Sequence, residues 1–265
     1  MMDIPYLLVD AFTSTAFRGN PASVCFMPSQ TSDAMLQAIA CEFNLSETAF
    51  LFDAGDRYDL RWFTPLAEVD LCGHATLAAA FALNHQDRGA KNHYRFNTRS
   101  GELGCHREGD TFRLNFPATP PTPADIDAKI LKGLGLSTCV DFARSIFDIL
   151  IVLDQESTVA ELEPDFSALR HGDYRGIIVT SASDQPDVDF VSRFFAPGLG
   201  VDEDPVTGSA HCCLGPYWSG RLDRHHMKAK QLSKRGGELT VSVQNDRVEL
   251  CGGAVLVASG TLYLP

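Results

Sequence analysis

The sequence predicts an α+β protein made of two similar lobes that arose by duplication of one unit. Gly101-Glu102-Leu103 recurs as Gly237-Glu238-Leu239, an offset of 136 residues in a chain of 265, and an alternating strand follows each copy. A helix start at Cys72 has a counterpart near Pro205, an offset of 133 residues. Three-residue strings also match by chance, but two offsets near half the chain length support each other and favour an internal duplication.

The first hundred residues predict several strands and few helices. Ser32 or Asp33 caps a helical pattern of apolar residues that continues to Phe43. Small apolar residues fill 73 to 83 on every side, which predicts a buried helix surrounded by strands. Alternating or apolar runs predict strands at residues 6–12, 24–27, 48–52 and 58–63.

A proline-rich stretch, residues 117–123, predicts the linker between the lobes, because proline disfavours helices and central strands. We therefore expect an N-terminal lobe of residues 1–118 and a C-terminal lobe of residues 119–265, with a last strand that can return to the first lobe. A helix is predicted from Ala124 to Leu134, ended by Gly135. Strands are predicted at 111–116 and 247–251, after the two Gly-Glu-Leu strings.

Composition excludes several partners. With 34 acidic and 22 basic residues the net charge is −12, which disfavours nucleic acid and anionic membranes. There is no apolar run long enough for a membrane span, and the first five residues lack the pattern of a signal peptide, so we expect a cytoplasmic protein. The eight cysteines are scattered through apolar surroundings and are expected to be reduced and mostly buried.

Three segments carry groups suited to acid–base chemistry. Glu47 lies where a helix meets an apolar strand, His74 lies at a predicted helix start, and Asp204 precedes another. A partly buried Glu47 would have a raised pKa, as a general base requires, and helix-start N–H groups favour negative charge. Each residue also has a structural interpretation: a solvated turn glutamate, a buried histidine and a helix-capping aspartate.

Cys72 beside His74 also suggests a nucleophile or a racemase, since a thiol at a helix N-terminus has a lowered pKa. A zinc site is disfavoured because the cysteines and histidines lack Cys-x-x-Cys or His-x-x-x-His spacing. We find no esterase elbow, phosphate-loop or dinucleotide motif either. We therefore expect no metal and no organic cofactor.

With these residues laid out, the chain resembles the PhzF-like phenazine biosynthesis family of the diaminopimelate epimerase-like superfamily. The resemblance covers nearly the whole length. It rests on Val9-Asp10-Ala11-Phe12, Phe17-Arg18-Gly19-Asn20-Pro21-Ala22, Asn44-Leu45-Ser46-Glu47-Thr48-Ala49-Phe50, Arg61-Trp62-Phe63-Thr64-Pro65, Leu71-Cys72-Gly73-His74-Ala75-Thr76 and Glu203-Asp204-Pro205-Val206-Thr207-Gly208-Ser209-Ala210.

The resemblance implies two similar lobes, each a curled, mostly antiparallel, barrel-like sheet around a central helix, with the active site in the cleft between them. It implies a cofactor-independent isomerase that moves a proton between carbons of a small anionic substrate like trans-2,3-dihydro-3-hydroxyanthranilate. The implied catalytic residues are Glu47 as acid and base, His74 and Asp204. The implied substrate-binding residues are Gly73, Gly208, Ser209, Ser46 and Asn20.

Two alternatives remain. Racemases of the superfamily use two facing cysteines; here Cys72 matches the first, but Pro205 occupies the second position, so two-thiol epimerisation should fail. An epimerase using Cys72 with Glu47 stays open, as does a catalytically silent protein that binds a small ligand. The family resemblance also implies a homodimer.

Overall fold

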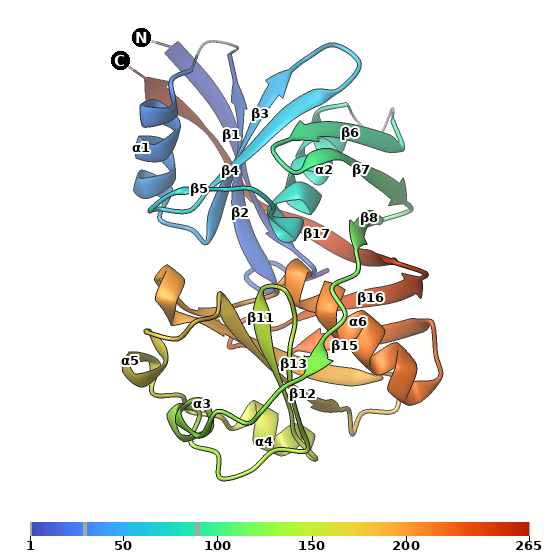
Figure 1. Cartoon of the computed structure of the whole chain (residues 1–265). Coiled ribbons are helices and arrows are strands. Elements are labelled where there is room, and N and C mark those ends of the chain that lie inside the picture. Colours follow the sequence, from blue (N-terminus) through green and yellow to red (C-terminus); the bar gives the residue numbers. More distant parts are fainter. Residues whose placement is uncertain (1, 29–30, 88–90, 265) are drawn as a thin grey trace. The chain divides into compact units, whose positions relative to one another are not determined.

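The computed structural model describes residues 2–28, 31–87 and 91–264, and in it the chain forms two compact units. Unit 1 comprises Met1–Asn115 with Cys251–Pro265, and unit 2 comprises Phe116–Leu250. Figure 1 colours both units along the chain. Each unit is a curled, mostly antiparallel sheet with one long buried helix, which confirms the predicted α+β class.

Unit 1 has two helices. α1 (Asp33–Phe43) begins as predicted at the N-cap Ser32, whose hydroxyl accepts a hydrogen bond from the Met35 N–H. The strands are β1 (Met2–Ala11), β2 (Asn20–Met27), β3 (Glu47–Asp53), β4 (Tyr58–Phe63), β5 (Glu68–Val69), β6 (His93–Thr98), β7 (Gly101–Glu108) and β8 (Thr111–Pro117). The second helix, α2 (Gly73–Gln86), is buried and lies against β1, β2 and β3.

The burial of α2 (Gly73–Gln86) follows directly from its composition. Nine of its residues are buried, five of them alanines, and they surround the helix rather than forming one stripe. Small side chains let the strands approach the helix axis from several directions. The first turn of the helix is therefore held rigidly by the sheet that encloses it.

Unit 2 contains the proline-rich segment and the second half of the chain. Its long helix is α6 (Gly208–Leu222), which packs against β15 and β16. The short helices are α3 (Ala128–Gly133), α4 (Glu156–Ala160), α5 (Phe166–Leu169) and the 3₁₀ turn η1 (Pro197–Leu199). The strands are β9 (Thr122–Pro123), β10 (Asp141–Arg144), β11 (Asp148–Val152), β12 (Gly176–Ala182), β13 (Phe190–Ala196), β14 (Val201–Asp204), β15 (His226–Gln231), β16 (Gly237–Gln244) and β17 (Arg247–Leu264).

The strand pairings of unit 2 repeat those of unit 1. β2 and β3 pair in parallel, with α1 between them in the sequence. β11 and β12 also pair in parallel, with α4 and α5 between them in the sequence. The next two pairs, β3–β4 and β12–β13, are antiparallel. β4 and β6 pair in parallel, with α2 between them in the sequence, and β13 and β15 pair in parallel, with α6 between them in the sequence. β7 and β16 both begin at the repeated Gly-Glu-Leu string. The duplicated unit predicted from the sequence is therefore present.

A partly buried ion pair is also duplicated. Arg61 of β4 donates two hydrogen bonds of 2.7 Å to Glu68, and Arg193 of β13 donates two of 2.7 and 3.0 Å to Glu203. Each guanidinium also lies over the ring of a phenylalanine two residues later, with 5.1 and 4.9 Å from Cζ to the ring centroid. Both pairs fasten the strand that leads toward a long helix.

Three details differ from the prediction. α3 begins at Ala128 rather than Ala124, because the side chain of Asp127 accepts from the Lys129 N–H and caps the helix there. The second long helix begins at Gly208, three residues after Pro205. The proline-rich stretch contains a short strand, β9, which pairs with β10.

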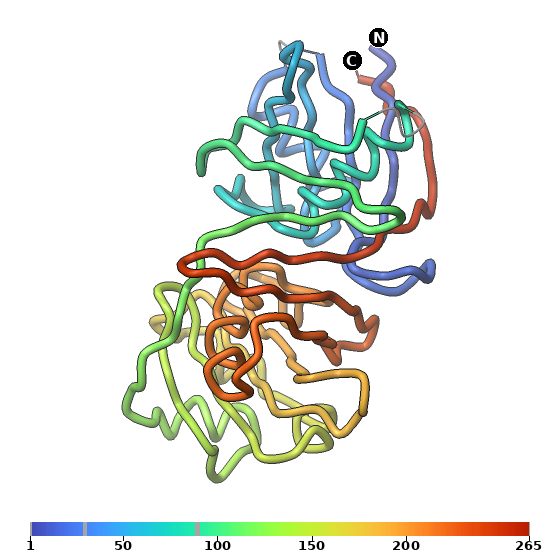
Figure 2. Tube along the Cα trace, turned by 90° about the vertical axis from the view of Figure 1, so that its right-hand side faces the viewer, coloured from blue at the N-terminus to red at the C-terminus, as the bar shows by residue number. Residues whose placement is uncertain are grey.

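β17 belongs to both units. Its residues from Cys251 onward are part of unit 1, where they pair antiparallel with β1 from Ala254↔Ala11 to Leu264↔Met2. Figure 2 shows this last segment following the first strand toward the two chain ends. The lobe boundary at residue 118 stays a prediction, as does the cleft between lobes.

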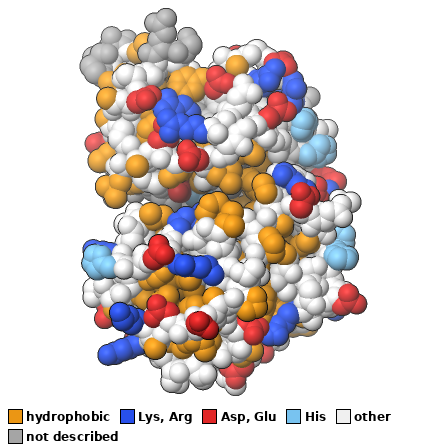
Figure 3. All heavy atoms as spheres, in the orientation of Figure 1, with side chains coloured by type: hydrophobic (Ala, Val, Ile, Leu, Met, Phe, Trp, Pro, Cys, Tyr) orange, Lys and Arg blue, Asp and Glu red, His pale blue; other side chains and the backbone are white. Residues whose placement is uncertain are grey.

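The described surface carries charged side chains of both signs. On the face shown in Figure 3, basic side chains lie beside acidic ones instead of forming a continuous basic field. Ion pairs made by exposed or half-exposed arginines include Arg224–Asp189 and Arg221–Asp141. Among the helices described, none has both the length and the apolar character needed to cross a membrane.

Candidate functional site

In unit 1, the fold brings Glu47, His74 and Asn20 together from three elements. Glu47 is the first residue of β3, Asn20 the first of β2, and His74 the second residue of α2. β2 and β3 are adjacent parallel strands, so their first residues lie at the same end of the sheet, where α2 begins. The distance from Glu47 Oε2 to His74 Nε2 is 3.4 Å.

The imidazole of His74 has a defined tautomer. Its Nδ1 lies 3.1 Å from the amide nitrogen of Asn20, which can only donate, so Nδ1 accepts. A neutral ring then carries its proton on Nε2, the nitrogen that faces the carboxylate of Glu47. Nε2 thus lies close to Glu47 Oε2, although the two atoms are not joined by a hydrogen bond in this arrangement.

Burial keeps this imidazole neutral. The side chain of His74 is 5% exposed, whereas that of Glu47 is 19% exposed and reaches the surface. Removal from water lowers the pKa of His74 to about 3, because burial penalises the imidazolium. At neutral pH the pair therefore consists of a partly accessible glutamate and an uncharged N–H donor.

The other predicted residues of unit 1 surround this pair. Gly73 is the first residue of α2, and Ser46 immediately precedes β3. Cys72 is the N-cap residue of α2, and its Sγ lies 3.5 Å from His74 Nδ1. All five predicted residues of unit 1 thus lie at the entries to β2, β3 and α2.

The same place offers three potential metal ligands, since atoms of Glu47, Cys72 and His74 lie within 4.8 Å of one another. The thiol approaches Nδ1 of the ring and the carboxylate approaches Nε2. One ion binds an imidazole through a single nitrogen, so these three side chains cannot all bind one ion in this arrangement. The residues do not fit a metal centre as they stand.

In unit 2, Asp204 and Gly208 belong to a turn fastened by hydrogen bonds. Asp204 ends β14, and its carboxylate accepts from the hydroxyl of Thr207, the N-cap residue of α6, at 2.5 Å. Gln231, 1% exposed, accepts from the Thr207 N–H and donates to the Asp204 carbonyl, at 2.9 and 2.7 Å. Asp204 is thus not the N-cap of α6, which was its alternative interpretation.

Ser209, the second residue of α6, contacts a group that the sequence analysis missed. Arg175, just before β12, donates from Nη2 to Ser209 Oγ at 3.0 Å. The same guanidinium donates from Nε and Nη2 to the carboxylate of Asp148, the first residue of β11, at 2.9 and 2.5 Å. Asp148 is 1% exposed, and its burial raises the pKa of the carboxyl while Arg175 opposes that shift.

The two units therefore carry corresponding clusters at corresponding places. Asn20, Glu47 and His74 meet where β2, β3 and α2 begin, and Asp148, Arg175 and Ser209 meet where β11, β12 and α6 begin. The first cluster has a carboxylate beside a neutral imidazole. The second has a guanidinium beside a hydroxyl.

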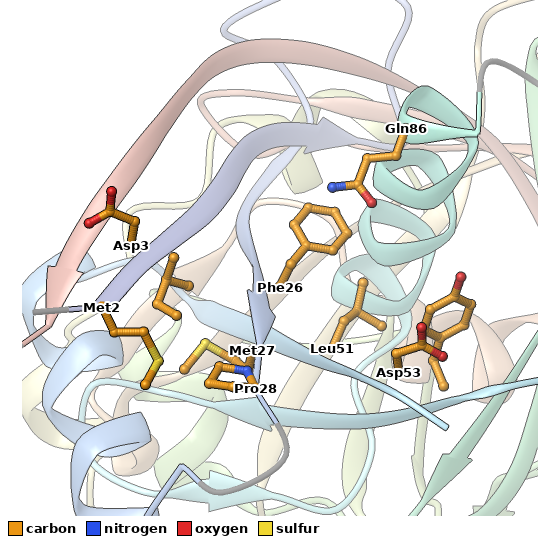
Figure 4. Close-up of a pocket in the computed structure, with 10 residues that line it drawn as sticks. Met2, Asp3, Phe26, Met27, Pro28, Leu51, Asp53 and Gln86 are labelled. Atoms are coloured by element: carbon orange, nitrogen blue, oxygen red, sulfur yellow. The ribbon is translucent and has the colours of Figure 1, made fainter. Parts of the chain in front are cut away.

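A separate hollow of 380 Å³ lies elsewhere on unit 1 (Figure 4). Its lining contains none of the predicted site residues among the part of the chain that the structure describes. Asp3, Asp53 and Gln86 supply its polar groups, beside apolar residues such as Phe26 and Leu51. It adds nothing to either cluster.

A duplicated unit in which a curled sheet encloses one helix, with polar clusters where that helix begins, defines a diaminopimelate epimerase-like α+β protein. A hydroxyproline epimerase from Agrobacterium vitis, solved with bound trans-4-hydroxy-L-proline, has a similar fold. The TM-score is 0.67 over 98% of this chain and 92% of that one, at 10% sequence identity.

Within that class, the chain belongs to the PhzC-PhzF family of phenazine biosynthesis-like proteins, whose sequence profile matches residues 9–260. An uncharacterized isomerase of Halalkalibacterium halodurans is 49% identical over 100% of both chains. The crystal structure of a PhzF family phenazine biosynthesis protein from Enterococcus faecalis is 44% identical, with a TM-score of 0.93 over 99% of this chain and 100% of that one.

Proposed function

We propose that the protein is a cofactor-independent isomerase of PhzF type, in which Glu47 moves a proton between two carbons of a small anionic substrate. The arrangement of Glu47, His74 and Asn20 is the observation that carries this proposal. A second relative, an uncharacterized isomerase of Pseudomonas aeruginosa, is 48% identical over 99% of this chain and 100% of its own length. The names of both isomerase relatives support the class of reaction.

In the proposed reaction, Glu47 removes a proton from a carbon activated by a neighbouring conjugated or carbonyl system and returns it to another carbon. The Nε2–H of His74 faces the carboxylate, so it can hold the glutamate in position or stabilise negative charge on the substrate. A neutral donor suits this role because it need not lose a proton during the reaction. Asp204 is assigned, with His74, to stabilising the charge that develops during the reaction. Gly73, Gly208, Ser209, Ser46 and Asn20 are assigned to substrate binding.

The substrate is proposed to resemble trans-2,3-dihydro-3-hydroxyanthranilate, as family membership suggests. The N-termini of α2 and α6 favour a carboxylate, since their first N–H groups and helix dipoles attract negative charge. A homodimer is part of the same proposal and rests on the family resemblance. A cytoplasmic location is also proposed and rests on the sequence expectation given above.

The test is proton NMR in D₂O with purified enzyme and the dihydro-hydroxyanthranilate. Wild type should isomerise the substrate and introduce deuterium into the product. Glu47→Gln keeps the shape of the side chain but not its basicity, and should lower kcat about 10²-fold or more. Glu42→Gln, on the exposed side of α1 in the same unit, is the matched control and should keep full activity. Turnover retained by Glu47→Gln would refute the mechanism.

An epimerase that uses Cys72 is the second candidate, because the thiol lies 3.5 Å from His74 Nδ1. A thiolate stabilised by imidazolium would require a charged His74, and burial lowers its pKa to about 3. We therefore expect Cys72→Ser to retain isomerase activity. Deuterium exchange at a stereocentre without net isomerisation, lost in Cys72→Ser, would favour the epimerase instead.

A further inference from the structure

We infer that Arg175, held by Asp148, is a specificity-determining residue that binds an anionic group of the substrate together with the hydroxyl of Ser209. The inference takes from the proposed function that the substrate is a small anion. It adds that Arg175 is the group that distinguishes a carboxylate from a neutral ligand. Neither Asp148 nor Arg175 belongs to the sequence motifs that led to the proposed site.

The guanidinium is fixed on three sides. Asp148 accepts from Nε and Nη2, Ser209 accepts from Nη2, and the ring of Phe147 lies 4.9 Å from Cζ. Asp148 cannot adjust to a different partner, because it is 1% exposed and begins a strand whose five residues are all buried. Arg175 therefore has one preferred orientation, which lowers the entropy lost when it binds a ligand.

The remaining donors of Arg175 are available. Its side chain is 31% exposed, and no described residue accepts a hydrogen bond from Nη1. Ser209 uses a lone pair to accept from Nη2, so its own O–H is left to donate elsewhere. An arginine Nη1 and a serine O–H fixed beside each other form a two-point donor site for one carboxylate or similar oxyanion.

Asp148 also sets the strength of the site. It compensates the charge of the guanidinium, so Arg175 recognises its ligand mainly through oriented N–H donors. Such a site rejects an analogue that lacks the acceptor oxygens, because the donors then remain without partners. Discrimination between charged and neutral ligands is therefore the property that Arg175 should control.

The test is calorimetric binding of two ligands that differ only in the carboxyl group, 3-hydroxyanthranilate and 2-aminophenol. Wild type should bind the carboxylate more tightly. Arg175→Met should weaken binding of 3-hydroxyanthranilate by about tenfold or more, since it removes a charge-assisted hydrogen bond, and should leave binding of 2-aminophenol unchanged. Arg221→Met, which removes a half-exposed arginine from the same unit, is the control and should change neither affinity.

Two further variants keep the inference falsifiable if Arg175→Met fails to fold. Arg175→Lys keeps the positive charge but loses the planar fork, and Asp148→Asn/Arg175→Met removes both members of the buried pair. Both should lose the preference for the carboxylate, and melting curves would confirm that they are folded. An unchanged preference, an equal loss for both ligands, or failure of wild type to prefer the carboxylate would overturn the inference.

This outcome can be separated from the fate of the proposed reaction. Glu47→Gln should keep the dependence of carboxylate preference on Arg175, because it alters the proposed base and leaves Arg175 in place. If wild type shows no turnover while Arg175→Met selectively loses carboxylate binding, the anionic subsite stands and the isomerase proposal falls. If turnover depends on Glu47 but carboxylate binding does not depend on Arg175, the reverse holds.

Discussion

The duplicated ion pair allows one fold to be perturbed twice at matching positions. In unit 2, the Arg193 side chain is 10% exposed and that of Glu203 is 19% exposed. Glu203→Gln removes the only carboxylate paired with Arg193 among the described residues, although Nη1 keeps its bonds to the carbonyls of Val159, Ala160 and Leu162. The variant leaves a buried guanidinium without its counter-charge.

Breaking a buried ion pair from one side costs about 3 kcal/mol or more of the free energy of unfolding, because the remaining charge stays desolvated. We take about 3 kcal/mol, since three carbonyl oxygens still accept hydrogen bonds from the guanidinium of Arg193. At about 2–4 °C per kcal/mol for a chain of this size, Tm should fall by roughly 6–12 °C. Thermal melting and urea titration would measure both values.

Glu68→Gln in unit 1 is the matched variant and should cost less, about 1–2 kcal/mol. The Arg61 side chain is 24% exposed and keeps a second carboxylate, since it donates to Asp33 at 2.7 Å. Glu68 also pairs with Arg99 at 2.7 Å, but that arginine is 53% exposed, so the loss of this second pair adds little. The expected order is thus fixed by the burial of the two arginines and by the carboxylate that Arg61 retains. A loss from Glu68→Gln equal to or larger than that from Glu203→Gln would refute this reasoning, as would losses below about 0.5 kcal/mol for both.

Two further predictions concern buried polar groups. Burial lowers the pKa of His74 to about 3 and that of His211 to about 4, so the unfolded chain takes up their protons first as pH falls below 6.5. The stability that the two neutral histidines contribute is complete above pH 6.5 and is lost progressively toward pH 3. His74→Gln should therefore make Tm fall less steeply between pH 7 and 5. The same slope of Tm against pH in this variant and in wild type would count against a neutral His74. Gln231→Met should lower the free energy of unfolding by about 1–3 kcal/mol, because it leaves the Thr207 N–H and the Asp204 carbonyl without their partner. Equal urea midpoints for this variant and wild type would contradict that role.

The sequence predicted elements that local chemistry determines. Ser32 caps α1 and the small residues after Cys72 form a buried helix, because capping and side-chain size act over one or two turns. The helix predicted at Ala124 begins later, at Ala128, because it is the side chain of Asp127 that accepts from the Lys129 N–H and caps the helix. The two candidate helix starts, Ala124 and Ala128, are only four residues apart, and the sequence alone did not decide between them.

Unit 2 was less predictable. The sequence analysis assigned no strand between residues 135 and 205, yet β11, β12 and β13 lie there. β11 and β13 are buried at every residue, so they show neither the alternation of a half-exposed strand nor the length of a helix. Their identity depends on pairing with strands distant in the sequence.

Sequence motifs pointed to Glu47, His74 and Asn20, which the fold brings together, whereas no motif pointed to Asp148, Arg175 or Gln231. Their partners lie 27, 34 and 24 residues away, beyond any local pattern. One feature of the sequence could have indicated Asp148. It is the first residue of a strongly apolar run, and a charge buried there needs a counter-charge. The repeated Arg-x-Phe of Arg61-Trp62-Phe63 and Arg193-Phe194-Phe195 would likewise have strengthened the duplication.

The shared strand β17 has a consequence for the order in which the chain can fold as it is synthesised. Unit 2 is one continuous segment, Phe116–Leu250, and all of it has been translated before the final residues of unit 1 exist. β1 pairs with β2 on one side, but unit 1 lacks its other neighbour until residues 251–264 emerge from the ribosome. The half of the protein made first is therefore completed last, and during synthesis the edge of β1 must wait for a strand that lies some 240 residues downstream.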